Sequence, residues 1–307
     1  MTDTLRSLAA GLLVFSLPLL SDALPAAADD ATDTAAATTY FRDGLDKVEK
    51  GRYRAAIRAF RNALQHDPSL AEACLNIGAC YDRIGQFDDG IPFYEKACAL
   101  DAGNPRLPYL FGAALTRNGR AQNSVKMLEK AAYLAPDNVD YLYNLGVGYA
   151  AVSQYHAAAT CFRQVTGQMT NVPGAVWYNL GLARFRSGMT NDALTAWSRV
   201  ELDDALAGRA RYYEALAARA GGGRARAMEL ARMAFTLDPT LDAARLLYAR
   251  VAHESGDYRA ACAMLEEMTR NGSAPAVDAM LAQVYADRAR AAEAAGAVTR
   301  AARHYRE

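Results

Sequence analysis

The chain has no surplus of charge of either sign, because 34 lysines and arginines balance 34 aspartates and glutamates among 307 residues. Nucleic-acid-binding proteins neutralise phosphates with a basic surplus, so this balance argues against that class unless basic residues gather on one face. The cysteines are also few, odd in number and irregularly spaced, which excludes a regular disulfide framework. We expect small buried hydrophobes at Cys74, Cys80, Cys98, Cys161 and Cys262, although the sequence leaves a Cys80–Cys98 pair open.

Recognisable catalytic and cofactor patterns are missing as well. There is no Gly-x-Ser-x-Gly, no phosphate-binding loop and no His-Glu-x-x-His, and the four histidines are scattered. The fragment Gly146-x-Gly148-x-x-Ala151 resembles part of a dinucleotide-binding loop, but such a loop needs a preceding strand and a helix that begins at the glycines. Here the surrounding segment is predicted to be helical already. The sequence therefore predicts a non-enzyme with no cofactor and no metal site.

The apolar run near the start of the chain is short. Arg6 precedes about 13 largely apolar residues, which is too few to span a bilayer as a helix. A small-residue segment follows, so the pattern is typical of a secretory signal peptide over residues 1–28, cleaved after Ala28. Residues 29–39 are predicted to form a disordered spacer. We expect a periplasmic protein, or alternatively a secreted one, without a stable membrane span after cleavage.

The remainder of the chain repeats with a period of about 34 residues. A small residue recurs at that spacing, followed later in each repeat by a small-x-x-x-large pair such as Ala158 and Phe162. Each repeat holds apolar residues at helical spacing twice, which predicts two helices. The recurring small residues are Gly78, Gly112, Gly146 and Gly181, and the glycines predicted to turn the chain between the helices are Gly51, Gly85, Gly119 and Gly256.

This pattern resembles the tetratricopeptide repeat family over about residues 37–274, in about seven repeats. The fourth repeat matches best, with Leu142-x-x-Leu145-Gly146-x-x-Tyr149 followed by Ala158-x-x-x-Phe162. The resemblance implies an all-α fold, a right-handed superhelical solenoid of stacked antiparallel helix hairpins. We assign the solenoid to residues 40–274 and a C-terminal capping helix, or a pair of helices, to residues 275–307.

The helical register is ambiguous in three repeats. In the first, a shifted apolar face fits better than the strict register does, and it consists of Phe41, Gly44, Leu45 and Val48. In the seventh, the register stays open, and the alternative face consists of Ala244, Leu247, Tyr248 and Val251. In the sixth, strict register would bury Arg211 and Glu214. We therefore expect a slipped helix there, with a buried stripe of Tyr213, Leu216, Ala217 and Ala220.

In a superhelix of this kind the first helix of each repeat lines the concave wall. By register, that wall carries three rows of side chains: Tyr109, Tyr143 and Tyr178; Asn76, Asn144 and Asn179; Arg83, Arg117 and Arg186. Tyrosine offers rigid apolar area with a polar tip, asparagine both donates to and accepts from a peptide backbone, and arginine holds a carboxylate with two parallel bonds. Some family members hold peptides with asparagine ladders, so the resemblance implies peptide binding; structural filling is the alternative use of the rows.

The sequence thus predicts an exported, non-catalytic scaffold or adaptor that binds an extended peptide or a partner loop in its concave groove. One alternative is a structural or glycan-contacting component of an envelope polysaccharide-export or outer-membrane assembly system, because tyrosines also stack on sugar rings. Another is an enzyme accessory in envelope assembly or cofactor maturation. The partner's identity is left open.

Overall fold

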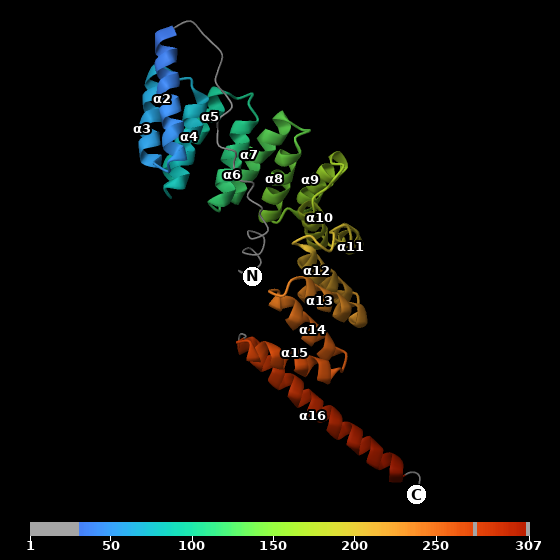
Figure 1. The fold of residues 1–307 in the computed structure, drawn as a ribbon. Coiled ribbons are helices and arrows are strands. Elements are labelled where there is room, and N and C mark those ends of the chain that lie inside the picture. The colour runs from blue at the N-terminus through green and yellow to red at the C-terminus, as the bar shows by residue number, and fades with distance from the viewer. Residues whose placement is uncertain (1–30, 273–274, 305–307) are drawn as a thin grey trace. The chain divides into compact units, whose positions relative to one another are not determined.

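The computed structural model describes residues 31–272 and 275–304, and over these residues the chain forms fifteen helices and no strand (Figure 1). The signal peptide expected over residues 1–28 lies outside the described residues. The chain divides into two compact parts, an N-terminal unit up to Thr170 and a C-terminal unit from Asn171. None of the helices in the described ranges combines the length and the apolarity that a bilayer crossing requires.

The N-terminal unit consists of four helix hairpins. Within each hairpin two consecutive helices pack closely, and neighbouring hairpins contact each other through successive helices. Their helices are α2 (Ala31–Glu49) with α3 (Tyr53–His66), α4 (Ala71–Arg83) with α5 (Phe87–Leu100), α6 (Arg106–Arg117) with α7 (Ala121–Leu134), and α8 (Val139–Ala151) with α9 (Tyr155–Gln168). The order of the hairpins follows the chain, as a solenoid requires.

The C-terminal unit continues the same pattern with three hairpins and a final long helix. The helices are α10 (Gly174–Arg186) with α11 (Thr190–Trp197), α12 (Ala207–Ala220) with α13 (Arg224–Leu237), α14 (Asp242–Glu254) with α15 (Tyr258–Arg270), and the single helix α16 (Pro275–His304). The first turns of α16 pack on α15 through Val277 and Val284, which are almost fully buried. These stacked hairpins confirm the predicted all-α fold of helix pairs.

The recurring small residue of the first helices allows the two helices of a hairpin to pack closely. A Cβ on Gly146 would lie 2.8 Å from the Phe162 ring, and a Cβ on Gly78 would lie 2.8 Å from the Tyr94 ring. Both rings belong to the second helix of the same hairpin, so glycine allows the two helices to approach closely. Helix α8 also begins at Val139, well before Gly146. The glycine pattern in this segment therefore serves helix packing, as its 34-residue period indicates.

The turn between the helices of a hairpin needs a left-handed residue. Gly51, Gly85, Gly119 and Gly256 have φ values of 67°, 75°, 71° and 79°, which confirms the prediction that glycine with positive φ ends the first helix. The fourth repeat places Ser153 at this position, with φ of 62°. It is a side-chain-bearing residue in a conformation that strongly favours glycine.

Replacing Ser153 by glycine is expected to raise the free energy of unfolding by about 1 kcal/mol. A side chain in the left-handed region costs ~1–2 kcal/mol, and the greater freedom of glycine in the unfolded chain offsets part of that gain. Urea unfolding followed by circular dichroism measures the change. Gly119→Ser is the matched reverse and should lose a similar amount, whereas a loss of stability in both variants would contradict the strain argument.

The disordered spacer expected over residues 29–39 differs from the structure, because α2 begins at Ala31. Ala37 is 3% exposed, and the hydroxyl of Thr38 donates to the carbonyl of Thr34 at 2.8 Å. The segment is rich in alanine, which has the highest helix propensity of all residues. Its low content of large apolar residues was therefore a poor guide, since the small side chain of Ala37 is buried.

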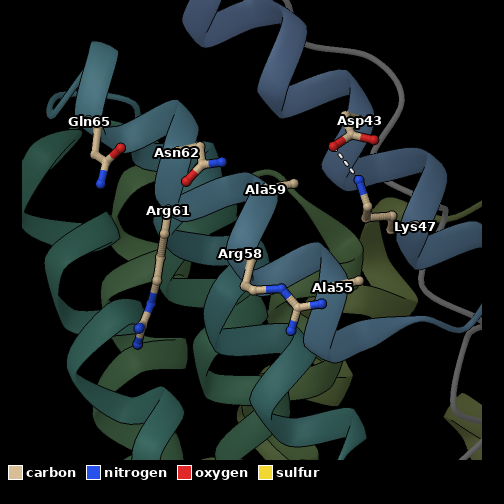
Figure 2. A pocket seen from close by; sticks show the side chains of 8 residues that line it. All are labelled: Asp43, Lys47, Ala55, Arg58, Ala59, Arg61, Asn62 and Gln65. Atoms are coloured by element: carbon tan, nitrogen blue, oxygen red, sulfur yellow. Dashed lines mark hydrogen bonds and ion pairs between the residues drawn. The ribbon is translucent and has the colours of Figure 1, made fainter.

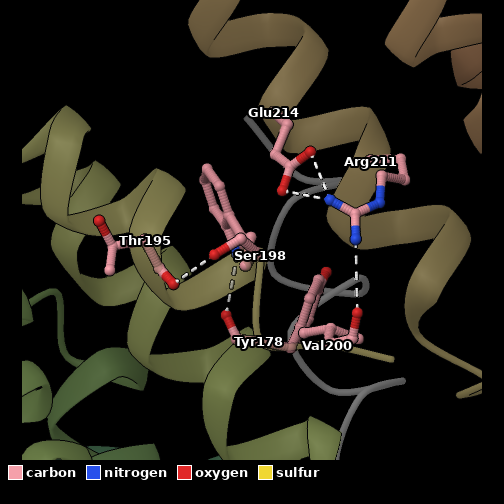
Figure 3. Close-up of polar contacts among 7 residues, drawn as sticks. Tyr178, Thr195, Ser198, Val200, Arg211 and Glu214 are labelled. Atoms are coloured by element: carbon pink, nitrogen blue, oxygen red, sulfur yellow. Dashed lines mark hydrogen bonds and ion pairs between the residues drawn. The ribbon is translucent and has the colours of Figure 1, made fainter. Parts of the chain in front are cut away.

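The slipped register expected in the sixth repeat is wrong. Glu214 is only 5% exposed, while Ala220 at the edge of the expected stripe is exposed. Figure 3 shows the reason: Arg211 Nη1 donates to both carboxylate oxygens of Glu214, at 2.5 and 2.6 Å, and Arg211 Nη2 donates to the carbonyl of Val200 at 3.4 Å. The strict register holds because two opposite charges are buried as a pair.

In the first repeat the shifted apolar face agrees with the structure, and in the seventh, where the register was open, the alternative face is the buried one. Phe41 packs its ring on Phe60 of α3, with centroids 5.5 Å apart. Ala244, Leu247 and Val251 of α14 are all 5% exposed or less. The buried face of the first helix was therefore misjudged in the repeat that buries ionised side chains.

The fifth hairpin has an unusually short second helix, α11, with eight residues against 13 or 14 in the other second helices. Its last residue, Trp197, is fully buried, and Nε1 of the indole donates to the carbonyl of Tyr178 at 3.2 Å. The indole also stacks on Tyr213 of α12, with ring centroids 5.6 Å apart. One large side chain thus connects three helices where α11 ends early.

Candidate partner-binding surface

The predicted tyrosine row does not form a row of exposed rings. Tyr143 and Tyr178 are 8% and 5% exposed, whereas Tyr109 is half-buried. The ring of Tyr143 packs against Phe162, with centroids 5.6 Å apart. The expectation that Tyr143 and Tyr178 reach toward a groove was wrong, because their rings complete the apolar contacts between helices.

Tyr109 instead pairs with a residue that the row prediction did not include. Its ring lies 4.6 Å, centroid to centroid, from the ring of Tyr141, at an interplanar angle of 32°. Asn144 Nδ2 donates to the Tyr109 hydroxyl at 3.2 Å. Burial, with a contribution from the Asp140 carboxylate, raises the pKa of Tyr109 above its ordinary value, so the phenol stays protonated at neutral pH. Tyr141 was missed because it precedes the core leucine by one residue, where the repeat pattern carries no fixed residue type.

The asparagine row divides between buried and half-buried side chains. Asn76 is 3% exposed, and its Nδ2 donates to the carbonyl of Glu72 at 2.8 Å. Asn144 makes the same bond to the carbonyl of Asp140 at 2.8 Å, in addition to the bond with Tyr109. Asn179 is half-buried on α10. The amides of Asn76 and Asn144 are therefore bonded to the backbone of their own helices, and that of Asn144 also reaches the neighbouring first helix.

The arginine row is partly neutralised within the fold. Arg117 pairs with Asp82 at 2.7 Å, while Arg83 and Arg186 are exposed. At the other end of the same two helices, Arg106 pairs with Glu72 at 3.1 Å. Burial raises the pKa of Glu72, and the Arg106 charge opposes that rise. Two ion pairs between α4 and α6 thus connect successive first helices.

The structure brings a subset of the predicted residues together. Tyr109 and Asn144 meet on neighbouring first helices, α6 and α8, together with Tyr141, and we name these three residues the aromatic–amide cluster. Asn76, Arg83, Arg117 and Tyr143 also belong to the N-terminal unit, and Tyr178, Asn179 and Arg186 to the C-terminal unit. The candidate surface is therefore smaller than predicted and lies within one unit.

Nothing in the described ranges points to metal or thiol chemistry. No three His, Cys, Asp or Glu side chains among those residues gather as a metal site requires. All five cysteines are buried and free, including Cys80 and Cys98. Burial raises the pKa of Cys80 to about 12 and that of Cys161 to about 11. These thiols stay protonated at neutral pH, so they are poor nucleophiles.

Part of the chain is similar in sequence to known repeat proteins. Residues 41–105 match the family model described as tetratricopeptide repeat. The chain is 29% identical over 115 residues to BBSome complex member BBS4 of Bos taurus, which covers 38% of this chain and 22% of that protein. It is 22% identical over 141 residues to TPR repeat-containing protein YpiA of Bacillus subtilis, covering 46% and 33%. The chain thus spans a third or less of the length of these relatives.

Two solved structures are similar in fold. YrrB, described as a TPR protein with an unusual peptide-binding site, has a TM-score of 0.54 at 22% identity, with 61% of this chain and 95% of that chain covered. PilF of Pseudomonas aeruginosa has a TM-score of 0.51 at 19% identity, with 73% and 99% covered. At this identity the likeness concerns the fold alone. Residues 41–105 are thus similar to tetratricopeptide repeats, and the same hairpin architecture recurs in both units.

Proposed function

We propose that the protein is a non-catalytic scaffold that binds a segment of a partner protein through the aromatic–amide cluster. The observation that carries the proposal is the half-buried Tyr109–Tyr141 pair with Asn144 beside it. Large aromatic side chains with a polar tip dominate the energetics of many protein interfaces. The peptide-binding site named for YrrB supports the proposal as an analogy of fold. Which partner this chain binds depends on the side chains of its own binding surface.

The cluster is suited to binding because it is held in place before a partner arrives. The Asn144 amide fixes the Tyr109 hydroxyl, and the neighbouring ring of Tyr141 limits its rotation. A side chain that is already ordered loses little conformational entropy on binding. The charge of Arg106 lies close enough to lower the pKa of Tyr141, against the larger effect of burial. Arg106 is already paired with Glu72, so a partner segment with an apolar residue that packs on the two rings fits this cluster.

The double variant Tyr109→Ala with Tyr141→Ala is expected to weaken partner capture at least about tenfold, because truncating an aromatic anchor costs more than ~1.4 kcal/mol. The measurement is affinity capture with residues 29–307, followed by titration of the captured partner. Tyr133→Ala is the matched control, since Tyr133 on α7 is 84% exposed. Capture that survives in the double variant would contradict the proposal. Binding of purified envelope glycan without any protein would favour the glycan-contacting alternative.

We further propose that the protein is exported and loses residues 1–28. The sequence pattern of this segment supports the proposal, and α2 begins at Ala31, shortly after the expected cleavage. Fractionation of cells should recover the chain in the periplasm, and sequencing of its amino terminus should begin at Asp29. Recovery of the uncleaved chain in the cytoplasm would contradict this.

A further inference from the structure

Helix α3 presents basic side chains without acidic ones. Its sequence contains Arg54, Arg58 and Arg61, all exposed, and no aspartate or glutamate. This concentration is local, since the whole chain has no net charge. A single-signed patch on a neutral protein attracts ligands of the opposite sign at short range.

A hollow of about 440 Å³ adjoins two of these arginines, Arg58 and Arg61 (Figure 2). It lies between α2 and α3 and is lined by Asp43, Lys47, Ala55, Arg58, Ala59, Arg61, Asn62 and Gln65. Ala55 and Ala59 leave room for a chain to approach the helix closely. The amides of Asn62 and Gln65 can both donate to and accept from a peptide backbone.

The basic side chains around the hollow differ in the partners that they have within the protein. Lys47 pairs with Asp43 across one helical turn. Arg61 donates to the hydroxyl of Tyr81 at 3.1 Å, and its guanidinium lies 5.7 Å from the centre of the Phe93 ring. Arg58 has no ion pair among the residues that the structure describes. Its guanidinium is therefore available to pair with an anionic group of a ligand.

We propose that this face of α3 binds an extended acidic segment of a partner protein, one with carboxylates on alternate residues. Arg54, Arg58 and Asn62 succeed each other at four-residue steps, about 6 Å apart along the helix. Same-side residues of an extended chain repeat at about 6.6 Å. Successive carboxylates thus reach Arg54 and Arg58 in register, each held by two parallel bonds to a guanidinium. This surface is separate from the aromatic–amide cluster and independent of its function.

The test is fluorescence polarisation with a labelled peptide of alternating glutamate and serine, added to the full-length protein. We expect binding that weakens as salt is raised, because the contacts are exposed charges. The double variant Arg54→Gln with Arg58→Gln should weaken it at least about tenfold. The matched control is Arg163→Gln, an exposed arginine on α9, which should leave the affinity unchanged.

The proposal would be overturned by no binding of the peptide, by equal binding of its glutamine counterpart, or by equal affinity in the double arginine variant. Tighter binding of duplex DNA or of phosphatidylserine vesicles to the same arginines would also overturn it, because the surface would then select phosphate. Circular dichroism of the variant shows whether it folds. Tyr109→Ala with Tyr141→Ala should leave peptide binding here intact, so the two proposals fail separately.

Discussion

Replacing Glu214 by alanine is expected to destabilise the C-terminal unit by about 3–5 kcal/mol, because Arg211 would remain charged inside the protein without its carboxylate. The side chains of Arg211 and Glu214 are 13% and 7% exposed. Arginine cannot shed its proton to escape the cost. Both tryptophans of the chain, Trp177 and Trp197, lie in this unit. Urea unfolding followed by tryptophan fluorescence therefore measures the loss directly.

Two further variants separate the buried charge from the lost contact area. Arg211→Met with Glu214→Leu removes both charges and should recover most of the stability, because apolar side chains replace a buried pair well. Glu229→Ala removes the carboxylate of an exposed pair with Arg226, at 59% and 51% exposure, and should cost less than about 1 kcal/mol. Equal losses for Glu214→Ala and Glu229→Ala would show that burial of the pair is irrelevant.

Replacing Gly181 by alanine is expected to lower the free energy of unfolding by about 2–4 kcal/mol. The added Cβ would fall well inside the van der Waals distance of Trp197 Nε1. That indole is fully buried and stacked on Tyr213, so it has no free space to move into. A shift of the indole would also break its hydrogen bond to the carbonyl of Tyr178, which adds to the strain of overpacking. Tryptophan fluorescence during urea unfolding reports both effects.

Gly167→Ala is the matched control for Gly181→Ala. Gly167 lies in helix α9, and a Cβ added there would meet nothing within 4 Å. Alanine should then stabilise the helix by about 0.5–1 kcal/mol, because glycine loses more conformational freedom on folding. Circular dichroism is the suitable measurement in the N-terminal unit. If the two glycine variants changed stability in the same direction, close packing at Gly181 would not be the cause.

The features that could be predicted from the sequence are those tied to the repeat period. The small residue at Gly146 and the turn glycine at Gly119 recur at fixed spacing, and each has one geometric reason. Helix pairs follow from the apolar spacing, so the fold class was predictable. The helix over residues 31–39 was not, because alanine serves both helices and unstructured segments and only the contact with α3 decides between them.

The candidate site was harder to predict, because it depends on side-chain direction. Tyr143 and Tyr109 occupy equivalent positions in the repeat, yet Tyr143 turns toward Phe162 while Tyr109 meets Tyr141 of the next first helix. A one-dimensional register cannot separate these outcomes. The same holds for Arg211, whose burial depends on Glu214 one helical turn later. A pattern that considers each residue alone cannot predict that two charged residues, each unfavourable in a core, are buried as a pair.

The hydrogen bonds between hairpins have a consequence for how the chain folds during synthesis. The bond from Asn118 to Asp82 joins residues 36 apart, and the pair between Arg219 and Glu254 joins residues 35 apart. Partners this near in sequence give a low contact order, which favours rapid folding. When a hairpin leaves the ribosome, the preceding hairpin that it contacts has already been synthesised. It can therefore pack without contacts to segments that are far away in the sequence. The N-terminal unit can therefore assemble while the C-terminal unit is still being translated.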